Sequence, residues 1–450
     1  MASKWPFFKI SDCAKVYSGF AFKSQDLGDR GIPVVKIKNV NNRTVNIADT
    51  QFFPQELLNE KHSRFFLEDG DVLIAMTGQG SVGRVGRLSN SSNQRILLNQ
   101  RVGKFIAKEN LNLRYFFYVS SSSYYEEIFF NAGLGSGQPN LSPDVIGQVE
   151  IPLPPLPEQK AIAHVLGSLD DKIELNRRMN ETLEGMAQAL FKSWFVDFDP
   201  VIDNALAAGN PIPEPLAQRA ETRRQAIANG TANREAAQAF PASFRFTEEL
   251  GWIPEGWEVN KIVEEVNLVM GQSPSSDHYN KDGKGLPFHQ GVTNYGERFP
   301  KHEQFSTGGN RIAEKGDILF SVRAPVGRIN IADQRLIIGR GLSALRHNMD
   351  CQSYLVYFLK SFFQKEDSIG SGTIFNAVTK KDMENIPLIS PSEELTLAFN
   401  VKGDSFDARI SRNTKETQTL AKLRDVLLPK LISGELRIPQ AEKMVEEAIA

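Results

Sequence analysis

The chain has 450 residues, a length that favours two or three domains over a single core. Hydrophobic residues make up 41% and charged residues 24%, which is ordinary for a globular protein, and no apolar run approaches the roughly 18 residues needed to cross a bilayer. The start lacks the features of a signal peptide, and the two cysteines, Cys13 and Cys351, match no metal-ligand spacing. We therefore expect a cytoplasmic protein without disulfides or a bound metal. The net charge of −2 neither favours nor excludes nucleic acid.

Residues 1–153 alternate short apolar runs with turns rich in Gly, Asn and Ser, which indicates an irregular α/β globule. Within this part, residues 70–87 read GDVLIAMTGQGSVGRVGR, an apolar strand followed by a small-residue turn and Val-Gly-Arg. Six basic residues and no acidic one lie between Val72 and Lys108: Arg84, Arg87, Arg95, Arg101, Lys104 and Lys108. A single run of this kind is as often an ordinary solvated face as a surface for an anionic partner, and only a second run at a matching place would favour the partner.

Residues 154–199 open with a Pro-rich cluster and continue as one long predicted helix. Its apolar positions, 166, 169, 173, 183, 187, 190 and 194, follow a heptad spacing, and Asn176 and Asn180 occupy the two missing positions. Such a stripe is often the buried face of a helix in an ordinary bundle, but its length favours a coiled coil. Residues 200–255 are polar and Ala-rich, as in a partly helical connector.

The rest of the chain repeats the first half, block by block and in the same order. GDILFSVRAPVGRI at 316–329 matches the stretch at 70–87, and YLVY from Tyr354 matches YFFY from Tyr115. The second basic run holds Asp333 as its only acidic residue beside Arg323, Arg328, Arg335, Arg340 and Arg346. The repeat predicts a second α/β domain at 256–388, a second long helix at 389–436 and a tail at 437–450.

The two long helices are predicted to pair as an antiparallel coiled coil, since a and d positions then face each other. One register sets Asn180 opposite Asn413 and Asn176 opposite Thr417, so that polar residues meet polar residues. Arg424 opposite Leu169 is the poor pair in this register. The predicted core of the pair is Leu166, Ile173, Asn176, Asn180, Leu183, Ile410, Asn413, Leu420 and Leu427. A helix of about 40 residues is roughly 60 Å long, which suits a spacer between two sites on DNA.

Catalytic motifs are weak. Asp144, Glu158 and Lys160 have the form of a nuclease site with two carboxylates for Mg²⁺, but Glu158 equally suits the first turn of the long helix, and Leu395 stands where the second repeat would need Lys160. No phosphate-binding loop, dinucleotide fingerprint or paired histidines occur in the sequence. The chain therefore reads as a binding protein rather than a catalyst, with a stand-alone Mg-dependent nuclease as one alternative and a protein-binding scaffold as another.

Both repeats carry residues suited to DNA. Arg and Lys match guanine edges and phosphates, and Asn and Gln match adenine edges. Any one of them is more often an ordinary turn residue, but their recurrence in both repeats favours DNA contact. The candidates in the first repeat are Lys36, Lys38, Asn39, Asn41, Gln79, Arg84, Arg87, Arg101, Gln138 and Asn140. Those in the second repeat are Gln290, Asn294, Tyr295, Arg323, Arg328, Arg340, Thr373 and Asn376.

The motifs IPLPPLPEQKAI at 151–162, FVDFDP at 195–200 and GWIPEGW at 251–257, together with the duplicated globules, resemble the specificity subunits of type I restriction-modification systems over nearly the entire chain. The resemblance implies two target recognition domains, each reading one half of a split DNA site, and helices that set the gap and dock two methyltransferase subunits. It also implies that S-adenosylmethionine, ATP and Mg²⁺ act in the methyltransferase and restriction subunits, with no cofactor bound by this chain. The second entry sequence, IPLISPSEEL, departs from the first by lacking Pro-Pro and Gln, which puts its partner contacts in doubt.

Overall fold

The computed structural model describes residues 4–90, 93–134, 139–368 and 377–449. The chain divides into two compact units, one made of Met1–Asn176 with Lys415–Ala450 and the other of Arg177–Thr414. We call them unit 1 and unit 2. Each unit contains one copy of the repeat and a part of each long helix, so the predicted spacer helices belong to both units.

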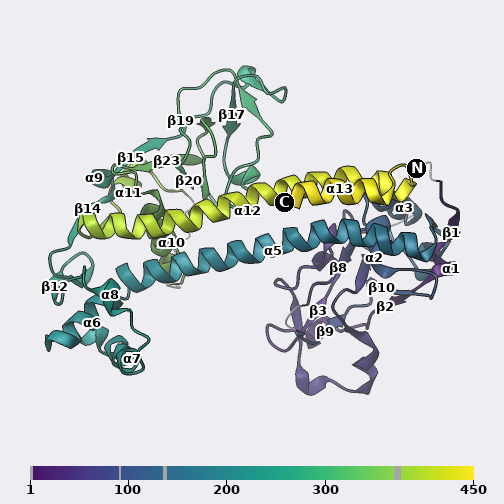
Figure 1. Cartoon of the computed structure of the whole chain (residues 1–450), viewed down its shortest axis with the longest axis horizontal. Helices are drawn as coiled ribbons and strands as arrows, with labels where there is room; N and C mark the ends of the chain where they lie inside the picture. The colour runs from purple at the N-terminus through teal and green to yellow at the C-terminus, as the bar shows by residue number, and fades with distance from the viewer. Residues whose placement is uncertain (1–3, 91–92, 135–138, 369–376, 450) are drawn as a thin grey trace. The chain divides into compact units, whose positions relative to one another are not determined.

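The globule of unit 1 is built from short strands and a few helices, which can be followed in Figure 1. The strands are β1 (Phe7–Lys9), β2 (Ala14–Ser18), β3 (Ile32–Val35), β4 (Arg43–Thr44), β5 (Gln51–Phe53), β6 (Phe66–Leu67), β7 (Val72–Ala75), β8 (Val85–Arg87), β9 (Ile96–Leu98), β10 (Val102–Ala107) and β11 (Glu150–Pro152). The helices are α1 (Ile10–Cys13), α2 (Leu113–Ser120), α3 (Ser123–Ala132) and α4 (Pro143–Gln148).

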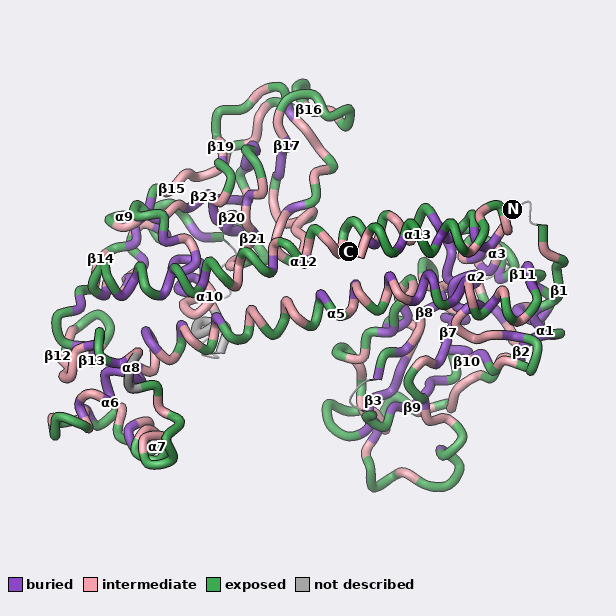
Figure 2. The backbone as a smooth tube through the Cα atoms, viewed as in Figure 1, coloured by how far each residue is buried: buried purple, intermediate pink, exposed green. Residues whose placement is uncertain are grey.

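These strands form three sheets, with orders β2-β10-β7-β8-β4, β5-β3-β9-β6 and β1-β11. All four residues of β3 and of β7 are buried, as expected for apolar strands covered on both faces, and Figure 2 shows β7 and β8 as largely buried. Pairs such as Phe105 with Phe116 pack edge to face, with ring centroids 4.6 Å apart. The core of the globule thus lies between the first sheet and the helices.

The globule of unit 2 follows the same plan. Its strands are β14 (Glu258–Lys261), β15 (Val266–Met270), β16 (Tyr279–Asn280), β17 (Leu286–His289), β18 (Phe305–Ser306), β19 (Ile312–Ala313), β20 (Ile318–Ser321), β21 (Ile329–Ile331), β22 (Leu336–Ile338), β23 (Leu342–His347) and β24 (Pro387–Ser390). Its helices are α9 (Ile262–Glu265), α10 (Gln352–Ser368) and α11 (Lys380–Glu384).

The strand orders reveal the duplication. The order β15-β23-β20-β21 repeats β2-β10-β7-β8, and β14-β24 repeats β1-β11. The parallel pairing of β3 with β9 recurs as β17 with β22. The predicted repeat of two α/β domains is therefore confirmed at the level of sheet topology.

The long helices are α5 (Leu156–Phe195) and α12 (Glu393–Ser433). In unit 1 the first part of α5 packs on the last part of α12, and Leu166 and Leu427 belong to one core cluster. In unit 2 the last part of α5 packs with the first part of α12, and Phe191 lies 5.5 Å from Phe399 between ring centroids. The two helices are therefore antiparallel in each unit, as the heptad pattern predicts. Figure 2 shows buried and exposed residues alternating along both.

The segment predicted as a tail at 437–450 contains a helix. Residues Ile438–Ile449 form α13, because apolar residues recur there at helical spacing. Ala441 and Val445 are buried in the core of unit 1, beside Leu428 and Ile432 of α12. The end of the chain is thus part of unit 1.

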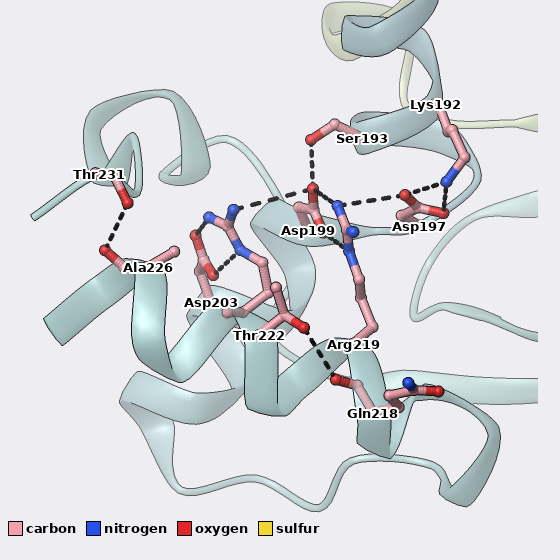
Figure 3. Close-up of polar contacts among 11 residues, drawn as sticks. Lys192, Ser193, Asp197, Asp199, Asp203, Gln218, Arg219, Thr222, Ala226 and Thr231 are labelled. Atoms are coloured by element: carbon pink, nitrogen blue, oxygen red, sulfur yellow. Dashed lines mark hydrogen bonds and ion pairs between the residues drawn. The ribbon is translucent and has the colours of Figure 1, made fainter. Parts of the chain in front are cut away.

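The connector contains α6 (Asp199–Ala208), α7 (Ala217–Ala228), α8 (Arg234–Ala237) and a hairpin of β12 (Phe244–Thr247) with β13 (Gly251–Pro254). Paired arginines of α7 face paired aspartates of α6 (Figure 3). The Arg219 guanidinium donates twice to the Asp199 carboxylate at 2.6 Å, and Arg223 Nε donates to Asp203 Oδ1 at 2.8 Å. Such forked ion pairs fix the geometry of both groups, so the connector is an ordered helical hairpin.

Candidate nucleic-acid interface

The Gly-Asp that opens each repeated hairpin is structural. Gly70 and Gly316 adopt φ of 84° and 91°, which glycine tolerates best. In unit 1 the Asp71 carboxylate accepts from the backbone N–H of Glu68 at 2.8 Å and pairs with Lys104 at 2.6 Å. In unit 2 Asp317 makes the equivalent contacts, with the N–H of Glu314 at 2.7 Å and with Arg346 at 2.6 Å. Two of the basic residues in the predicted runs thus serve to anchor this turn.

The glycine of the Val-Gly-Arg that follows has the same conformation in both units. Gly83 and Gly327 have φ of 87° and 83°, and their N–H groups donate to Ala75 at 2.9 Å and to Ser321 at 3.1 Å. The arginines that follow differ in surroundings. Arg84 is 37% exposed and lies 3.7 Å from the Glu126 carboxylate.

Arg328 is exposed, and among the side chains that the structure describes no carboxylate pairs with it. The positive charge at this position is therefore freer to meet a phosphate in unit 2 than in unit 1.

The tip of the hairpin in unit 1 lies beside two other segments. Thr77 forms an isolated β-bridge with Asn140, and the carbonyl of Met76 accepts from Leu141 N–H at 2.7 Å. On its other side a Cβ on Gly78 would come within 3.0 Å of Ile37, which belongs to the turn after β3. The hairpin tip, the turn after β3 and the segment at residue 140 therefore form one surface. We call it surface 1 and define it by Lys36, Lys38, Gln79, Arg101 and Asn140.

Arg101 belongs to surface 1 because its carbonyl accepts from Met76 N–H at 3.0 Å. Gln79, Arg101, Lys38 and Asn140 are exposed, and Lys36 is partly so. Lys38 pairs with Asp49 at 3.0 Å, but both side chains are well exposed, so this pair is weak and easily exchanged for a ligand. Surface 1 can thus offer cations and amides to a partner.

The equivalent surface in unit 2 gathers Gln290, Arg323 and Arg340, and we call it surface 2. Gln290 follows β17 as Lys36 follows β3, and its side-chain oxygen accepts from Ser273 at 2.7 Å. The carbonyl of Gly341 accepts from Val322 N–H at 3.0 Å, which brings the backbones next to Arg340 and Arg323 together. All three side chains are exposed. Surface 2 therefore carries two arginines and one amide, whereas surface 1 carries two lysines, one arginine and two amides, so the two surfaces offer different hydrogen-bonding groups.

Several candidate residues build loops instead of facing outward. Asn39 is 1% exposed, and its amide accepts from Lys36 N–H at 2.9 Å and donates to the Asp49 carbonyl at 2.7 Å. The Tyr295 hydroxyl donates to the Leu319 carbonyl at 3.0 Å, and burial raises its pKa. A polar group whose hydrogen bonds are already made inside the protein is not free to read a base, so both expectations are revised.

The remaining candidates divide by position. Arg87 is half-buried, with a guanidinium nitrogen 3.0 Å from where a Cβ on Gly70 would stand, so it packs over the Gly-Asp turn. Asn41 and Asn294 are partly exposed on the turns after β3 and β17. Three candidates lie outside the described residues: Gln138, Thr373 and Asn376.

The helix pair places its asparagines inside. Asn176 and Asn413 are both 1% exposed, and Asn413 Nδ2 donates to Asn180 Oδ1 at 2.9 Å, as the register predicts. Asn180 and Leu183 are half-buried. The other apolar positions of the predicted pair are buried: Leu166, Ile173, Ile410, Leu420 and Leu427.

Two details of the register differ. Asn176 Nδ2 donates to Glu416 Oε2 at 3.0 Å, whereas the Thr417 hydroxyl is buried and has no hydrogen-bond partner among the described residues. The poor pair of Arg424 with Leu169 is relieved, because the guanidinium turns to Asp170 Oδ1 at 2.7 Å. A long, flexible side chain can therefore point out of the helix interface even where its heptad position lies in that interface.

The nuclease alternative gains no support. Asp144 is exposed in the first turn of α4, Lys160 is exposed on α5, and Glu158 is half-buried in the first turn of α5. No group of three or more His, Cys, Asp or Glu side chains is placed to hold a metal ion in the part of the chain that the structure describes.

The motif around Glu158 has another role. The buried Gln159 amide accepts from Asn112 N–H at 2.8 Å and donates to the Pro154 carbonyl at 2.9 Å. The hydrogen bonds of Gln159 thus hold the start of α5 against the globule. Among the described helices none is long and apolar enough to span a membrane.

Two arginines that reach the long helices were not singled out in the sequence, namely Arg43 and Arg298. They occupy the same place in the turns after β3 and β17, where Asn46 N–H donates to the Asn39 carbonyl and Lys301 N–H to that of Asn294, both at 2.8 Å. Aligning the repeats without a gap sets Arg43 over Glu297, because unit 2 has one extra residue in this turn. The match is visible only once the backbone hydrogen bonds are known.

Comparison with known proteins identifies the class. Residues 2–185 and 254–395 match the family described as the type I restriction modification DNA specificity domain. The chain therefore belongs to this family, which is the DNA-recognition and non-catalytic component of type I restriction-modification systems.

Individual relatives agree with this assignment. A chain of Methanocaldococcus jannaschii, provisionally named the MjaX specificity subunit of a type I restriction enzyme, is 26% identical over 96% of this chain and 94% of its own length. The HindI specificity subunit of Haemophilus influenzae is 27% identical over 66% of this chain and 71% of its own. The crystal structure of the S subunit from M. genitalium has a TM-score of 0.57 at 16% identity and covers 95% of this chain and 96% of that one, which shows a shared fold.

Proposed function

We propose that the chain is the specificity subunit of a type I restriction-modification complex and that surfaces 1 and 2 each read one half of a bipartite DNA site. The observation that carries the proposal is the repeat itself. The same hairpin, with the same Gly-Asp turn and the same Val-Gly backbone, occurs once in each unit, while the tips differ: TGQGS at 77–81 and VRAP at 322–325. A common frame with different tips suits two readers of two different sequences.

The chemistry of the two surfaces suits base and phosphate contact. On surface 1, Gln79 and Asn140 offer amides that match adenine edges, and Lys36, Lys38 and Arg101 suit guanine or phosphate. On surface 2, Arg323 and Arg340 suit guanine or phosphate beside the amide of Gln290. We propose these residues as the DNA contacts, with Arg328 as a phosphate contact.

Partner subunits complete the function. We propose that two methyltransferase subunits dock on α5 and α12, which carry exposed apolar side chains: Leu175 and Met186 on α5, and Leu397, Val401 and Val426 on α12. Restriction subunits join through the complex. S-adenosylmethionine, ATP and Mg²⁺ act in the partners, and the complex works in the cytoplasm, where its DNA lies.

The test is a map of methylated adenines in DNA exposed to the assembled complex. The expected result is a two-part motif with an unspecified gap of constant length. Arg340→Ala should relax discrimination at one position of one half by about 1–3 kcal/mol if the guanidinium reads a base. Arg335→Ala is the matched control, because this exposed arginine pairs with Glu314 at 3.2 Å and is not part of surface 2.

A motif without two parts, or one that Arg335→Ala alters as much as Arg340→Ala does, would contradict the proposal. The nuclease alternative has its own test with the purified chain, Mg²⁺ and DNA. Metal-dependent cleavage that Glu158→Ala abolishes would replace the present assignment.

A further inference from the structure

The turns that contribute Lys36 and Gln290 to the two surfaces each end on an arginine that points the other way. Arg43 and Arg298 stand at the same backbone position beside the strand that follows Val-Gly-Arg. In unit 1, β4 pairs in parallel with β8, and Arg43 lies opposite Gly86. In unit 2, the Arg298 carbonyl accepts from Ile331 N–H at 2.9 Å, which joins the turn to β21. The repeated hairpin therefore holds both arginines in place through its backbone.

In unit 1 the Arg43 side chain reaches α12. Its Nη1 lies 3.4 Å from Asp425 Oδ1, and the side chain is only 18% exposed. The carboxylates here belong to a connected group. Arg424 joins Asp425 at 3.0 Å to Asp170 of α5 at 2.7 Å, and the Tyr118 hydroxyl donates to Asp170 at 2.7 Å.

In unit 2 the Arg298 side chain reaches both long helices. It lies 2.5 Å from Asp407 of α12 and 3.4 Å from Glu184 of α5, and it is 10% exposed. The Tyr357 hydroxyl donates to Glu184 at 3.2 Å, and Lys360 pairs with the same carboxylate. Of these residues, Arg298, Glu184 and Lys360 line a cavity of about 310 Å³ between the globule and the helices of unit 2.

The two arrangements share more than the arginine. Tyr118 and Tyr357 are the last residues of the blocks YFFY and YLVY, so each repeat supplies one arginine and one tyrosine to carboxylates of the long helices. The carboxylates match in part, since Asp170 and Asp407 occupy corresponding positions of the two long helices, whereas Asp425 and Glu184 do not correspond. Each repeat therefore keeps an arginine and a tyrosine against carboxylates of the long helices.

We propose that Arg43 and Arg298 are positioning residues for half-site recognition, each tying the turn that carries a DNA-reading side chain to the long helix of its own unit. A largely buried guanidinium held near one carboxylate in unit 1, and between two in unit 2, has fewer orientations open to it than one in solvent. The short turn between Lys36 and Arg43, or between Gln290 and Arg298, transmits that constraint to the surface. The inference rests on the proposed function, since it concerns how well each half-site is read.

The experiment compares methylation maps of complexes assembled with full-length variants. Arg43→Glu places two carboxylates together and should lower discrimination in one half of the motif by about tenfold, in the lower range for a lost base contact, while the other half stays unchanged. Arg298→Glu should do the same to the opposite half only. The charge exchange Arg43→Glu with Asp425→Arg should restore the first half, which no loss of fold would allow.

Arg114→Ala is the matched control. Arg114 of α2 also binds a long helix, pairing with Asp171 at 2.6 Å, but it is not on a reading turn, so its loss should leave both halves unchanged. If Arg43→Glu prevents assembly, Arg43→Met is judged by the same criteria. The inference is overturned if both halves relax together, if neither relaxes, if the charge exchange fails to restore the first half, or if Arg114→Ala has the same effect. A wild-type complex without a two-part motif would instead overturn the proposed function.

Discussion

Two asparagines pair between α5 and α12, and replacing each of them with alanine should affect stability to different degrees. Asn413 is 1% exposed, donates to Asn180 at 2.9 Å, and has a buried side-chain oxygen without a partner among the described residues. Asn180 is half-buried, and its own Nδ2 donates to Thr414 at 3.3 Å. The two amides therefore depend on each other to different degrees.

Asn180→Ala leaves the Asn413 amide buried with neither end bonded. A buried unsatisfied amide lowers stability by about 1–3 kcal/mol, and the better helix propensity of alanine offsets about 0.5 kcal/mol of this loss. We expect the free energy of opening of this part of α12 to fall by about 1–2 kcal/mol. Asn413→Ala instead removes the unpaired oxygen, and water can hydrate the half-buried Asn180, so its effect should stay within about 0.5 kcal/mol. In the double variant the cost of Asn180→Ala should disappear.

Hydrogen exchange of the α12 amides around Asn413 is the suitable assay, because it measures local opening without assuming that a two-unit chain unfolds in one step. Gln418→Ala is the control, since Gln418 is exposed on the same helix. Equal losses from the two single variants, or a coupling below about 0.3 kcal/mol in the double-mutant cycle, would refute this account of the buried amides.

Three further predictions concern stability. His289 accepts from or donates to His302 at 3.0 Å, and burial, with His302 beside it, lowers its pKa to about 4. The folded unit prefers neutral His289, so the contribution of this residue to stability is fully present above pH 6.5. The free energy of unfolding should fall by about 3 kcal/mol as the pH drops towards 4. Unfolding curves measured over a pH series should show this loss in the wild type but not in His289→Gln. Asp203→Ala should destabilise the connector by about 1–3 kcal/mol in thermal unfolding, since it removes the forked partner of Arg223, whose side chain is 17% exposed and keeps only Asp199 at 4.0 Å. An unchanged midpoint would contradict this. Gly327→Ala should lower the free energy of unfolding by about 1–2 kcal/mol, because the glycine has a positive φ. Gly83→Ala should lower it further, because only there would the added Cβ come within 3.0 Å of the α3 backbone. Equal losses in denaturant unfolding would count against that contact.

The large-scale features were predictable because they follow from periodicity and repetition. Heptad spacing predicts the antiparallel helix pair, and the position of Asn180 opposite Asn413 follows from matching polar with polar residues. The blocks recurring in order predict two globules of one topology. These signals extend over many residues, so a single exception such as Arg424 does not erase them.

The site was harder to predict, since the direction of one side chain leaves no mark on the sequence. Asn39 and Tyr295 have types that suit base contact, yet each hydrogen-bonds inside the protein. Arg43 and Arg298 were hidden by one extra residue in a turn. A usable signal did exist in the connector, where Asp199 and Asp203 recur with a four-residue spacing. Arg219 and Arg223 do the same, and each set therefore lies on one face of its helix.

The structure also shows that the arginine of Val-Gly-Arg is not the one whose contacts recur in both repeats. Arg84 of the repeated Val-Gly-Arg has a carboxylate neighbour in Glu126, whereas Arg328 has none among the described residues, so that position contributes unequally to charge at the surface. Arg43 and Arg298, by contrast, both turn inward to the long helices. In a duplicated DNA-recognition protein, the side of each globule that faces the shared helices is required to make similar contacts in both copies. The side that faces DNA must differ if the two half-sites differ. The inward arginines meet the first requirement, and in the proposed function the unlike tips after β7 and β20 meet the second.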